Sequence, residues 1–133
     1  MNMRWYVAIF DDAGDELHAR IGLTPEFHLN HKTGTVDLEH HTNFLHEIMP
    51  GESVAVYARL AGRSPKRLHY LMFLVNETKG ELAAIFACMN AFIDLTVRRT
   101  APFPSEILAK IDAWIEKDAK LAWPPPASGS MHA

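Results

Sequence analysis

The spacing of hydrophobic positions predicts a long helix at the start of the chain. Between residues 2 and 21, apolar residues recur every three or four positions, which is the repeat of an amphipathic α-helix. Asn2 is a residue type that caps helix N-termini, and Gly22 is typical of the position after a helix ends. Val7 and Phe10 widen the apolar face, so we expect this helix to be buried among other elements.

The middle of the chain predicts a β-sheet. A polar stretch at 24–34 is expected to be a loop, and four strand-like stretches follow it, at 35–46, 53–61, 68–75 and 82–95. The first two stretches alternate between apolar and polar positions, as strands with one covered face do. The last two are apolar on both faces, which predicts central strands that are covered on two sides.

The end of the chain predicts a second helix and a tail. Apolar residues keep the helical spacing over 105–121, and three consecutive prolines at 124–126 end the pattern. We therefore expect one domain over 1–121, followed by a proline-rich, disordered tail over 122–133. A helix, an antiparallel meander and a peripheral helix define an α+β fold, with the first helix on one face of the sheet.

Composition narrows the class of protein. The 133 residues carry a formal net charge of −3, which argues against nucleic acid or an anionic membrane as the main partner. Cys88 is the one cysteine, so an internal disulfide is excluded and a reducing cytoplasm is expected. No apolar run has the length of a membrane span, and no signal peptide is visible at the start of the chain.

A few polar residues are candidates for chemistry. Glu39 and His41 are two positions apart in the first strand, so alternation places both on one face, together with Asp37. Such a pair could orient or activate a water molecule, although a solvated polar face is the ordinary outcome of this pattern. His40 is expected to point to the other side and to pack there. Cys88 lies among apolar residues and is expected to be inert core.

Metal binding is not expected from the histidines. The pair His28 and His31 lies in the polar stretch without the cysteine or carboxylate spacing of a known metal site, so we predict no metal. Guanidinium groups suit bidentate contacts with phosphates, which makes Arg67, Arg98 and Arg99 candidate phosphate ligands, although solvated surface charge is the commoner explanation.

Several segments resemble a known family. Residues 1–6 and 10–13 resemble the helix entrance of thioesterases related to 4-hydroxybenzoyl-CoA thioesterase, which reads Asp-x-x-Gly-His-Met-Asn, an aromatic-rich turn and Phe-Asp-x-Ala. Residues 39–41 resemble a Glu-Thr-His element on the next strand of these proteins, and residues 66–69 and 98–104 resemble their third strand and closing segment. Among these thioesterases, the chain is most similar to the betainyl-CoA thioesterases of carnitine degradation.

The resemblance implies a hot-dog fold, in which an antiparallel sheet wraps a long central helix, and hydrolysis of an acyl-CoA thioester. It implies no cofactor besides the coenzyme A of the substrate, and a homodimer or homotetramer. Helix amides near Asn2 would bind the thioester carbonyl, and His41 with Glu39 would position the water. The arginines Arg67, Arg98 and Arg99 would bind the phosphates of coenzyme A.

The chain departs from the family at its start. In such enzymes a strand, an Asp and a Gly-His precede the Met-Asn, whereas this sequence opens at Met1, so we expect that translation begins further upstream. If the acid is absent, a non-catalytic hot-dog protein that binds acyl-CoA is the alternative. A hot-dog dehydratase is a third possibility, for which His18 is poorly placed, and a nuclear-transport-factor-like fold is the structural alternative.

Overall fold

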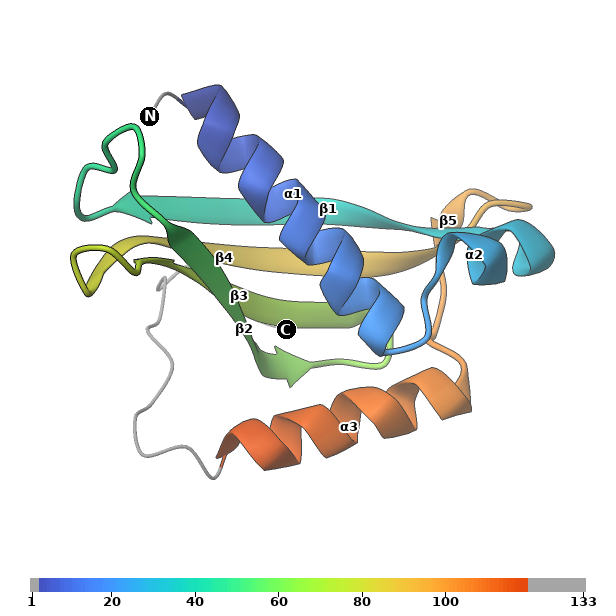
Figure 1. The fold of residues 1–133 in the computed structure, drawn as a ribbon. Coiled ribbons are helices and arrows are strands. Elements are labelled where there is room, and N and C mark those ends of the chain that lie inside the picture. The colour runs from blue at the N-terminus through green and yellow to red at the C-terminus, as the bar shows by residue number, and fades with distance from the viewer. Residues whose placement is uncertain (1–2, 120–133) are drawn as a thin grey trace.

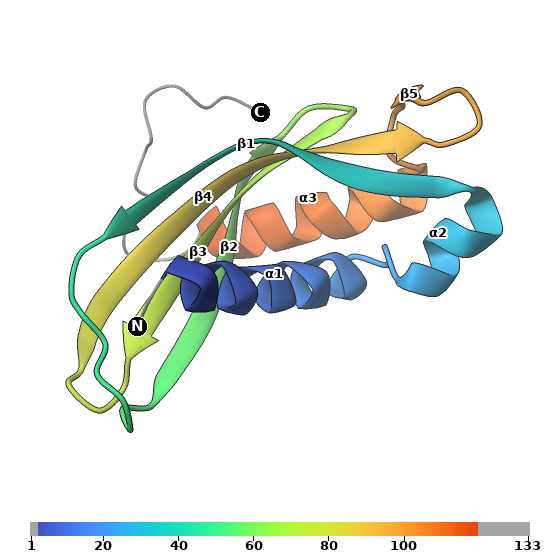
Figure 2. The ribbon, with the colours of Figure 1, turned by 90° about the horizontal axis from the view of Figure 1, so that it is seen from above.

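The computed structural model describes residues 3–119 (Figure 1). In chain order its elements are α1 (Met3–Arg20), α2 (Pro25–His31), β1 (Thr33–Phe44), β2 (Val54–Arg63), β3 (Arg67–Asn76), β4 (Glu81–Asp94), β5 (Arg99–Thr100) and α3 (Ser105–Ala119). The strands form one antiparallel sheet in the order β1-β4-β3-β2, with the short β5 paired to β4. The sheet curves around α1, and α3 lies along β2 on the same side (Figure 2). This is the α+β arrangement that the sequence predicts.

α1 is buried along one stripe. Tyr6, Phe10, Leu17 and Ile21 face the sheet and belong to the main core. The prediction of a helix buried around most of its circumference is wrong at Val7, which is 49% exposed. Burial of this inner stripe favours the contact between helix and sheet, since hydrophobic burial contributes about 25 cal/mol per Å² of apolar surface.

The end of α1 matches the sequence prediction. Gly22 follows the helix with φ +93, a left-handed conformation that glycine adopts without steric cost. The N–H of Gly22 donates to the carbonyl of Ala19 (3.1 Å) and that of Leu23 to the carbonyl of His18 (2.9 Å). The proposed cap at the other end, Asn2, lies outside the described residues.

The stretch 24–34, expected to be a loop, contains the helix α2. The Thr24 side chain accepts a hydrogen bond from the Phe27 N–H (3.1 Å), and Pro25 occupies the first turn, where a missing N–H costs nothing. Lys32 ends the helix in a left-handed conformation with φ 53. Seven residues are too few to show a helical period, so the capping pattern of Thr24 and Pro25 is the signal in the sequence that indicates α2.

β1 contains a bulge that changes which side chains share a face. The register with β4 shifts between Asp37 and Glu39, so Leu38 is an extra residue. His40 stacks on Phe86, which faces α1, whereas Glu39 and His41 pair with residues of the opposite sheet face. The prediction that Asp37 shares a face with Glu39 and His41 is therefore wrong, because the bulge restarts the alternation.

β3 and β4 are covered on both faces, as their sequences predict. The outer face of the sheet carries a second apolar cluster, made of Leu71, Phe73, Ala87 and Met89. Among the described residues, no helix is long and apolar enough to cross a membrane. The predicted tail over 122–133 lies outside the described part of the chain.

α3 is attached to β2 by a buried carboxylate. Asp118 is 7% exposed, and its Oδ2 accepts the backbone N–H of Leu60 at 3.0 Å. The same helix forms a more exposed, bidentate ion pair, in which the Arg63 guanidinium donates two hydrogen bonds of 2.7 Å to the Asp112 carboxylate. α3 therefore covers one end of the β2 edge strand and satisfies a backbone amide that would otherwise lack a partner.

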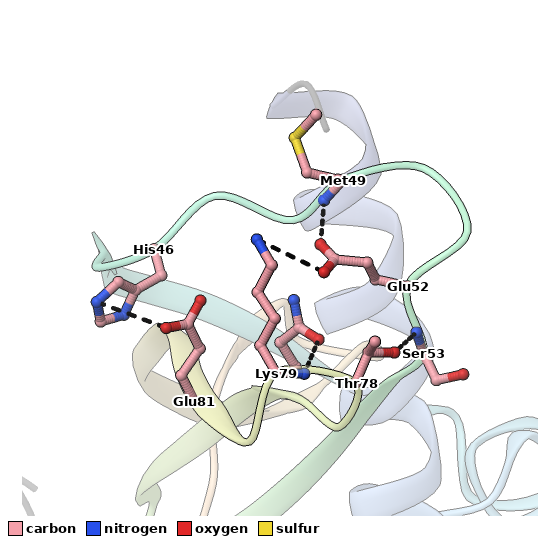
Figure 3. Close-up of polar contacts among 8 residues, drawn as sticks. His46, Met49, Glu52, Ser53, Thr78, Lys79 and Glu81 are labelled. Carbon is pink, nitrogen blue, oxygen red and sulfur yellow. Dashed lines mark hydrogen bonds and ion pairs between the residues drawn. The ribbon is translucent and has the colours of Figure 1, made fainter.

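The loop between β1 and β2 is held to the hairpin between β3 and β4 by polar contacts (Figure 3). Oε1 of Glu52 accepts the Met49 N–H at 2.6 Å, and its Oε2 lies 3.5 Å from Nζ of Lys79. The Ser53 N–H donates to Thr78 Oγ1 at 2.9 Å. These contacts fix the loop beside the N-terminal half of α1.

Candidate active site

A polar cavity of about 300 Å³ lies between α1 and the inner face of the sheet. Gly14 helps to form it, because a Cβ at this position would come within 3.6 Å of the Tyr70 hydroxyl oxygen. The lining comes from α1 and from three strands: Phe10, Asp11, Gly14, Asp15, His18, Thr35, Asp37, Tyr70, Phe86 and Asn90.

The cavity combines negative charge with aromatic rings. Asp11 and Asp15 are four residues apart on α1 and therefore lie on one face of the helix, and Asp37 joins them from β1. Phe10 and Phe86 stack with their ring centroids 5.0 Å apart. Anionic groups beside aromatic rings favour cationic ligands, because both attract positive charge.

A chain of hydrogen bonds crosses the cavity wall from α1 to β1. Nδ1 of His18 lies 2.7 Å from the carbonyl oxygen of Gly14, and its Nε2 lies 3.1 Å from Oδ1 of Asn90. The Nδ2 of Asn90 donates to Oδ1 of Asp37 at 2.8 Å, and the Cys88 thiol donates to the same oxygen at 3.3 Å. Asn90 is 2% exposed, so its amide depends on these two partners.

The other two titratable groups of this wall stay protonated. Burial raises the pKa of Tyr70 well above its usual value, and nearby Cys88 adds to the effect. Burial likewise raises the pKa of Cys88 to about 12. A thiol with so high a pKa is a poor nucleophile, so Cys88 serves as a hydrogen-bond donor and packing residue.

Glu39 and His41 form a pair outside this cavity. Nε2 of His41 lies 2.9 Å from Oε1 of Glu39, and both side chains are about two-fifths exposed, at 41% and 42%. They are on the sheet face opposite α1, with Ala87 and Met89 as their cross-strand neighbours on β4. The structure thus brings the two predicted residues together, but away from the carboxylates beside α1.

The three predicted phosphate ligands lie at one end of the sheet and are exposed. Arg67 begins β3 opposite Ala91 of β4, and Arg99 in β5 is opposite Asp94. Ala91 and Asp94 are three positions apart on β4, which is about 10 Å along the strand. Arg98 precedes β5 with φ 55. Within the described residues, no group of three or more His, Cys, Asp or Glu side chains could hold a metal ion.

Sequence reasoning missed most of the cavity. It did not select Asp37, Asn90, His18 or Tyr70, which meet only when the sheet and helix pack. One signal was available: Asp11, Asp15 and His18 follow at helical spacing, which places a polar stripe on a helix that is otherwise expected to be buried.

Comparisons with known proteins identify the family. The family model for the thioesterase-like superfamily matches residues 1–111. The chain belongs to this superfamily. A betainyl-CoA thioesterase of Pseudomonas aeruginosa is 35% identical over 120 residues, which are 90% of this chain and 76% of that protein. The L-carnitine dehydrogenase/betainyl-CoA thioesterase of Rhizobium meliloti is 28% identical over 90% of this chain, which spans about a quarter (24%) of that longer protein.

Solved structures agree with the family. A Staphylococcus aureus protein in complex with coenzyme A superposes with a TM-score of 0.87 at 27% identity, over 93% of this chain and 78% of that one. A DHNA-CoA thioesterase from the same species matches with a TM-score of 0.75 at 20% identity, over 91% and 84%. These likenesses confirm the predicted hot-dog fold, and the family confirms that the thioesterase-like chain is a thioester hydrolase that acts on acyl-CoA.

Proposed function

We propose that this thioesterase hydrolyses a CoA thioester whose acyl group is small and positively charged, and that the cavity beside α1 holds this group. The observation that supports this proposal most directly is the lining of the cavity, which combines the carboxylates of Asp11, Asp15 and Asp37 with aromatic rings. A methylated ammonium group is attracted both to the carboxylates and to the faces of the rings. The relatives named betainyl-CoA thioesterases support the same substrate class, since betainyl carries a trimethylammonium group.

The size of the cavity supports a short acyl group. A volume of about 300 Å³ is at the small end of ligand pockets, which run to about 1,000 Å³. A long fatty chain would need more apolar room than this polar cavity offers. The carboxylates would also repel an acidic acyl group.

Hydrolysis requires a positioned water and donors for the carbonyl oxygen. Two carboxylates of β1 compete for the water. Glu39 is held by His41, as the sequence predicts, whereas Asp37 opens on the cavity. We assign the water to Asp37, because the acyl group and the water must meet on the same side of the sheet. The predicted carbonyl donors near Asn2 lie outside the described residues. They precede Met3, which is about 22 Å before His18 along α1, so they are too far from Asp37 to serve the same carbonyl and belong to the competing assignment.

The remaining assignments concern coenzyme A and assembly. Arg67, Arg98 and Arg99 are assigned to the phosphates of coenzyme A, since guanidinium groups bind phosphates in a bidentate fashion. β1 is an edge strand, with β4 on its other side, so two copies can pair through it into a homodimer. We propose a cytoplasmic homodimer, or a homotetramer of two such dimers.

The decisive experiment compares two substrates that differ only in charge. Thiol release is measured with betainyl-CoA and with 3,3-dimethylbutyryl-CoA, in which carbon replaces the quaternary nitrogen. A desolvated cation–π contact of about 2 kcal/mol corresponds to a preference of about 30-fold in kcat/KM for the charged substrate. Asp11→Asn and Asp15→Asn should each reduce this preference. Asp12→Asn is the matched control, since Asp12 is exposed, as Asp11 and Asp15 are, but does not line the cavity.

The outcomes separate the alternatives. Equal rates for the two substrates would overturn the cationic acyl group, and tight binding without turnover would favour a non-catalytic acyl-CoA-binding protein. His41→Ala tests the competing assignment of the water. It should leave kcat unchanged if Asp37 carries the step. If the Glu39–His41 pair carries it, His41→Ala should lower kcat at least about 100-fold and Asp37→Asn should leave kcat unchanged.

A further inference from the structure

We propose that the adenosine nucleotide of coenzyme A binds in a groove between α2 and the turn that connects β4 to β5. Both elements lie at the same end of the sheet (Figure 1). The inference rests on the proposed function, because it places the other end of the same substrate. It deepens that function by naming where the carrier is held while the acyl group occupies the cavity beside α1.

The groove has a volume of about 610 Å³, and its two walls are joined by the backbone. The N–H of Leu95, in the turn after β4, donates to the carbonyl of Lys32 at the end of α2, at 2.9 Å. Oδ1 of Asp94 fixes the turn, since it accepts the N–H of Thr96 at 2.9 Å and the hydroxyl of Thr96 at 2.6 Å. The other wall is a face of α2 and its C-cap at helical spacing: Pro25, His28, Leu29 and Lys32.

The lining suits a flat base beside phosphates. Leu29 is 80% exposed and Leu95 is 51% exposed, so both walls present apolar surface that a purine ring would remove from water. Burial, and then nearby His18, lower the pKa of His28, so Lys32 is the cation of this lining. Arg98 belongs to the same turn as Leu95 and adds a guanidinium for a phosphate. An apolar slot beside cationic groups therefore fits a nucleotide.

β1 connects the groove to the cavity beside α1. Lys32 at the groove and Thr35 at the cavity are three positions apart, which is about 10 Å along a strand. Thr33 shares the face of Thr35, and its Oγ1 lies 2.9 Å from Nδ1 of His28, which lines the groove. The pantetheine arm between nucleotide and thioester can lie along this face, because hydroxyl groups suit its amides.

The two ends of this path carry opposite charge. The carboxylates of Asp11, Asp15 and Asp37 line the cavity, whereas Lys32 lines the groove. A CoA thioester with a cationic acyl group has the matching order, with its positive charge at the acyl end and its phosphates at the other. This complementarity admits the substrate in one direction and holds the thioester between the two sites, over β1.

Binding of the nucleotide alone tests the groove without turnover. Adenosine 3′,5′-bisphosphate, which lacks the pantetheine arm, is titrated into the full chain, and the backbone amides are followed by NMR. We expect saturable shifts at Lys32 and Thr96. Lys32→Gln should weaken binding at least about 10-fold, because it removes a charged hydrogen-bond donor. The matched control is Lys117→Gln, since Lys117 is exposed on α3 and does not line the groove.

A second pair of variants tests the apolar wall. Leu29→Glu sets a carboxylate against the phosphates and should weaken nucleotide binding by more than Lys32→Gln does. Leu45→Glu is its control, because Leu45 is a 49% exposed leucine outside the groove. Equal affinity in wild type, Lys32→Gln and Leu29→Glu would overturn the proposal. A loss of affinity in Arg67→Gln that Lys32→Gln does not share would overturn it as well.

Kinetics distinguish the groove from the proposed function. Betainyl-CoA is compared with betainyl-pantetheine, which lacks the nucleotide. The ratio of their kcat/KM values should fall about 10-fold in Lys32→Gln, through KM, because uniform binding is lost. If the nucleotide binds at the groove and neither thioester is hydrolysed, the proposed function fails and the groove stands. If both thioesters are hydrolysed with equal kcat/KM and no nucleotide binds, the groove fails and the proposed function stands.

Discussion

The carboxylate of Asp118 should contribute more to stability than any exposed charge on α3. It is buried, and it accepts the N–H of Leu60, which is itself 2% exposed and lies 58 residues earlier in the chain. Asp118→Ala leaves this amide without a partner in a place that water does not reach. A hydrogen bond to a charged group contributes about 1.5–3 kcal/mol net, so we expect the free energy of unfolding to fall by about 2 kcal/mol.

The assay is urea denaturation, followed by tryptophan fluorescence in a background of Trp5→Phe and Trp123→Phe, in which Trp114 is the emitter. This residue is on the same helix, with the Arg20 guanidinium 4.6 Å above its ring, so its emission reports the detachment of α3. The midpoint should fall without a change in the m-value, because the surface exposed on unfolding stays the same. For a domain of this length, about 2 kcal/mol corresponds to a decrease in Tm of about 8 °C.

Two further variants make the reasoning refutable. Asp118→Asn keeps an oxygen acceptor but loses the charge, so it should cost less than Asp118→Ala. Asp112→Ala removes a carboxylate from the same helix whose side chain is 52% exposed, and surface ion pairs contribute about 0–1 kcal/mol. If Asp118→Ala is no more destabilising than Asp112→Ala, or no more than Asp118→Asn, the buried hydrogen bond does not hold α3 in place.

Three other substitutions test separate features. Gly14→Ala should stabilise α1 by about 0.5–1 kcal/mol, since the new Cβ would lie at an ordinary contact distance of 3.6 Å from the Tyr70 hydroxyl oxygen. The same methyl group narrows the cavity, so kcat/KM should fall. Unchanged kinetics would place the substrate elsewhere. Gly22→Ala should cost about 1–3 kcal/mol, because φ is +93 there and the new Cβ would lie 2.9 Å from an α3 side chain; chemical denaturation measures this loss. The Met49 N–H lowers the pKa of Glu52, so the stabilisation from Glu52 is present above the ordinary pKa of a glutamate and is lost as the pH falls through the lower folded-state pKa. Glu52→Gln should therefore flatten the acid side of the Tm–pH curve, and an unaltered curve would contradict the assignment.

The long elements could be predicted from the sequence because each has many repeats of its own period. α3 begins at Ser105, as predicted, and the four long strands lie within a few residues of their predicted positions. Short elements give no such average: α2 has seven residues and β5 has two, so neither shows a period. Their positions are fixed by a cap and by tertiary pairing instead.

The cavity was harder to predict, because its parts are distant in sequence. His18 and Asn90 are 72 residues apart, and nothing in either local pattern says that they touch. Glu39 and His41, which are two residues apart, were correctly expected to lie together. Alternation failed for Asp37 because it assumes an uninterrupted ladder of backbone pairs, and Leu38 interrupts it.

This interruption lets one short stretch of chain supply acids to both sides of the sheet. In a regular strand, carboxylates two positions apart would point the same way, and neither could be placed beside α1 without the other. Removing the single residue Leu38 would restore the regular alternation of side chains along β1. Asp37 would then point away from the cavity, or Glu39 and His41 would point into it. Insertions and deletions of one residue at this point are thus a route by which related sequences could exchange their reactive groups without changing any of them.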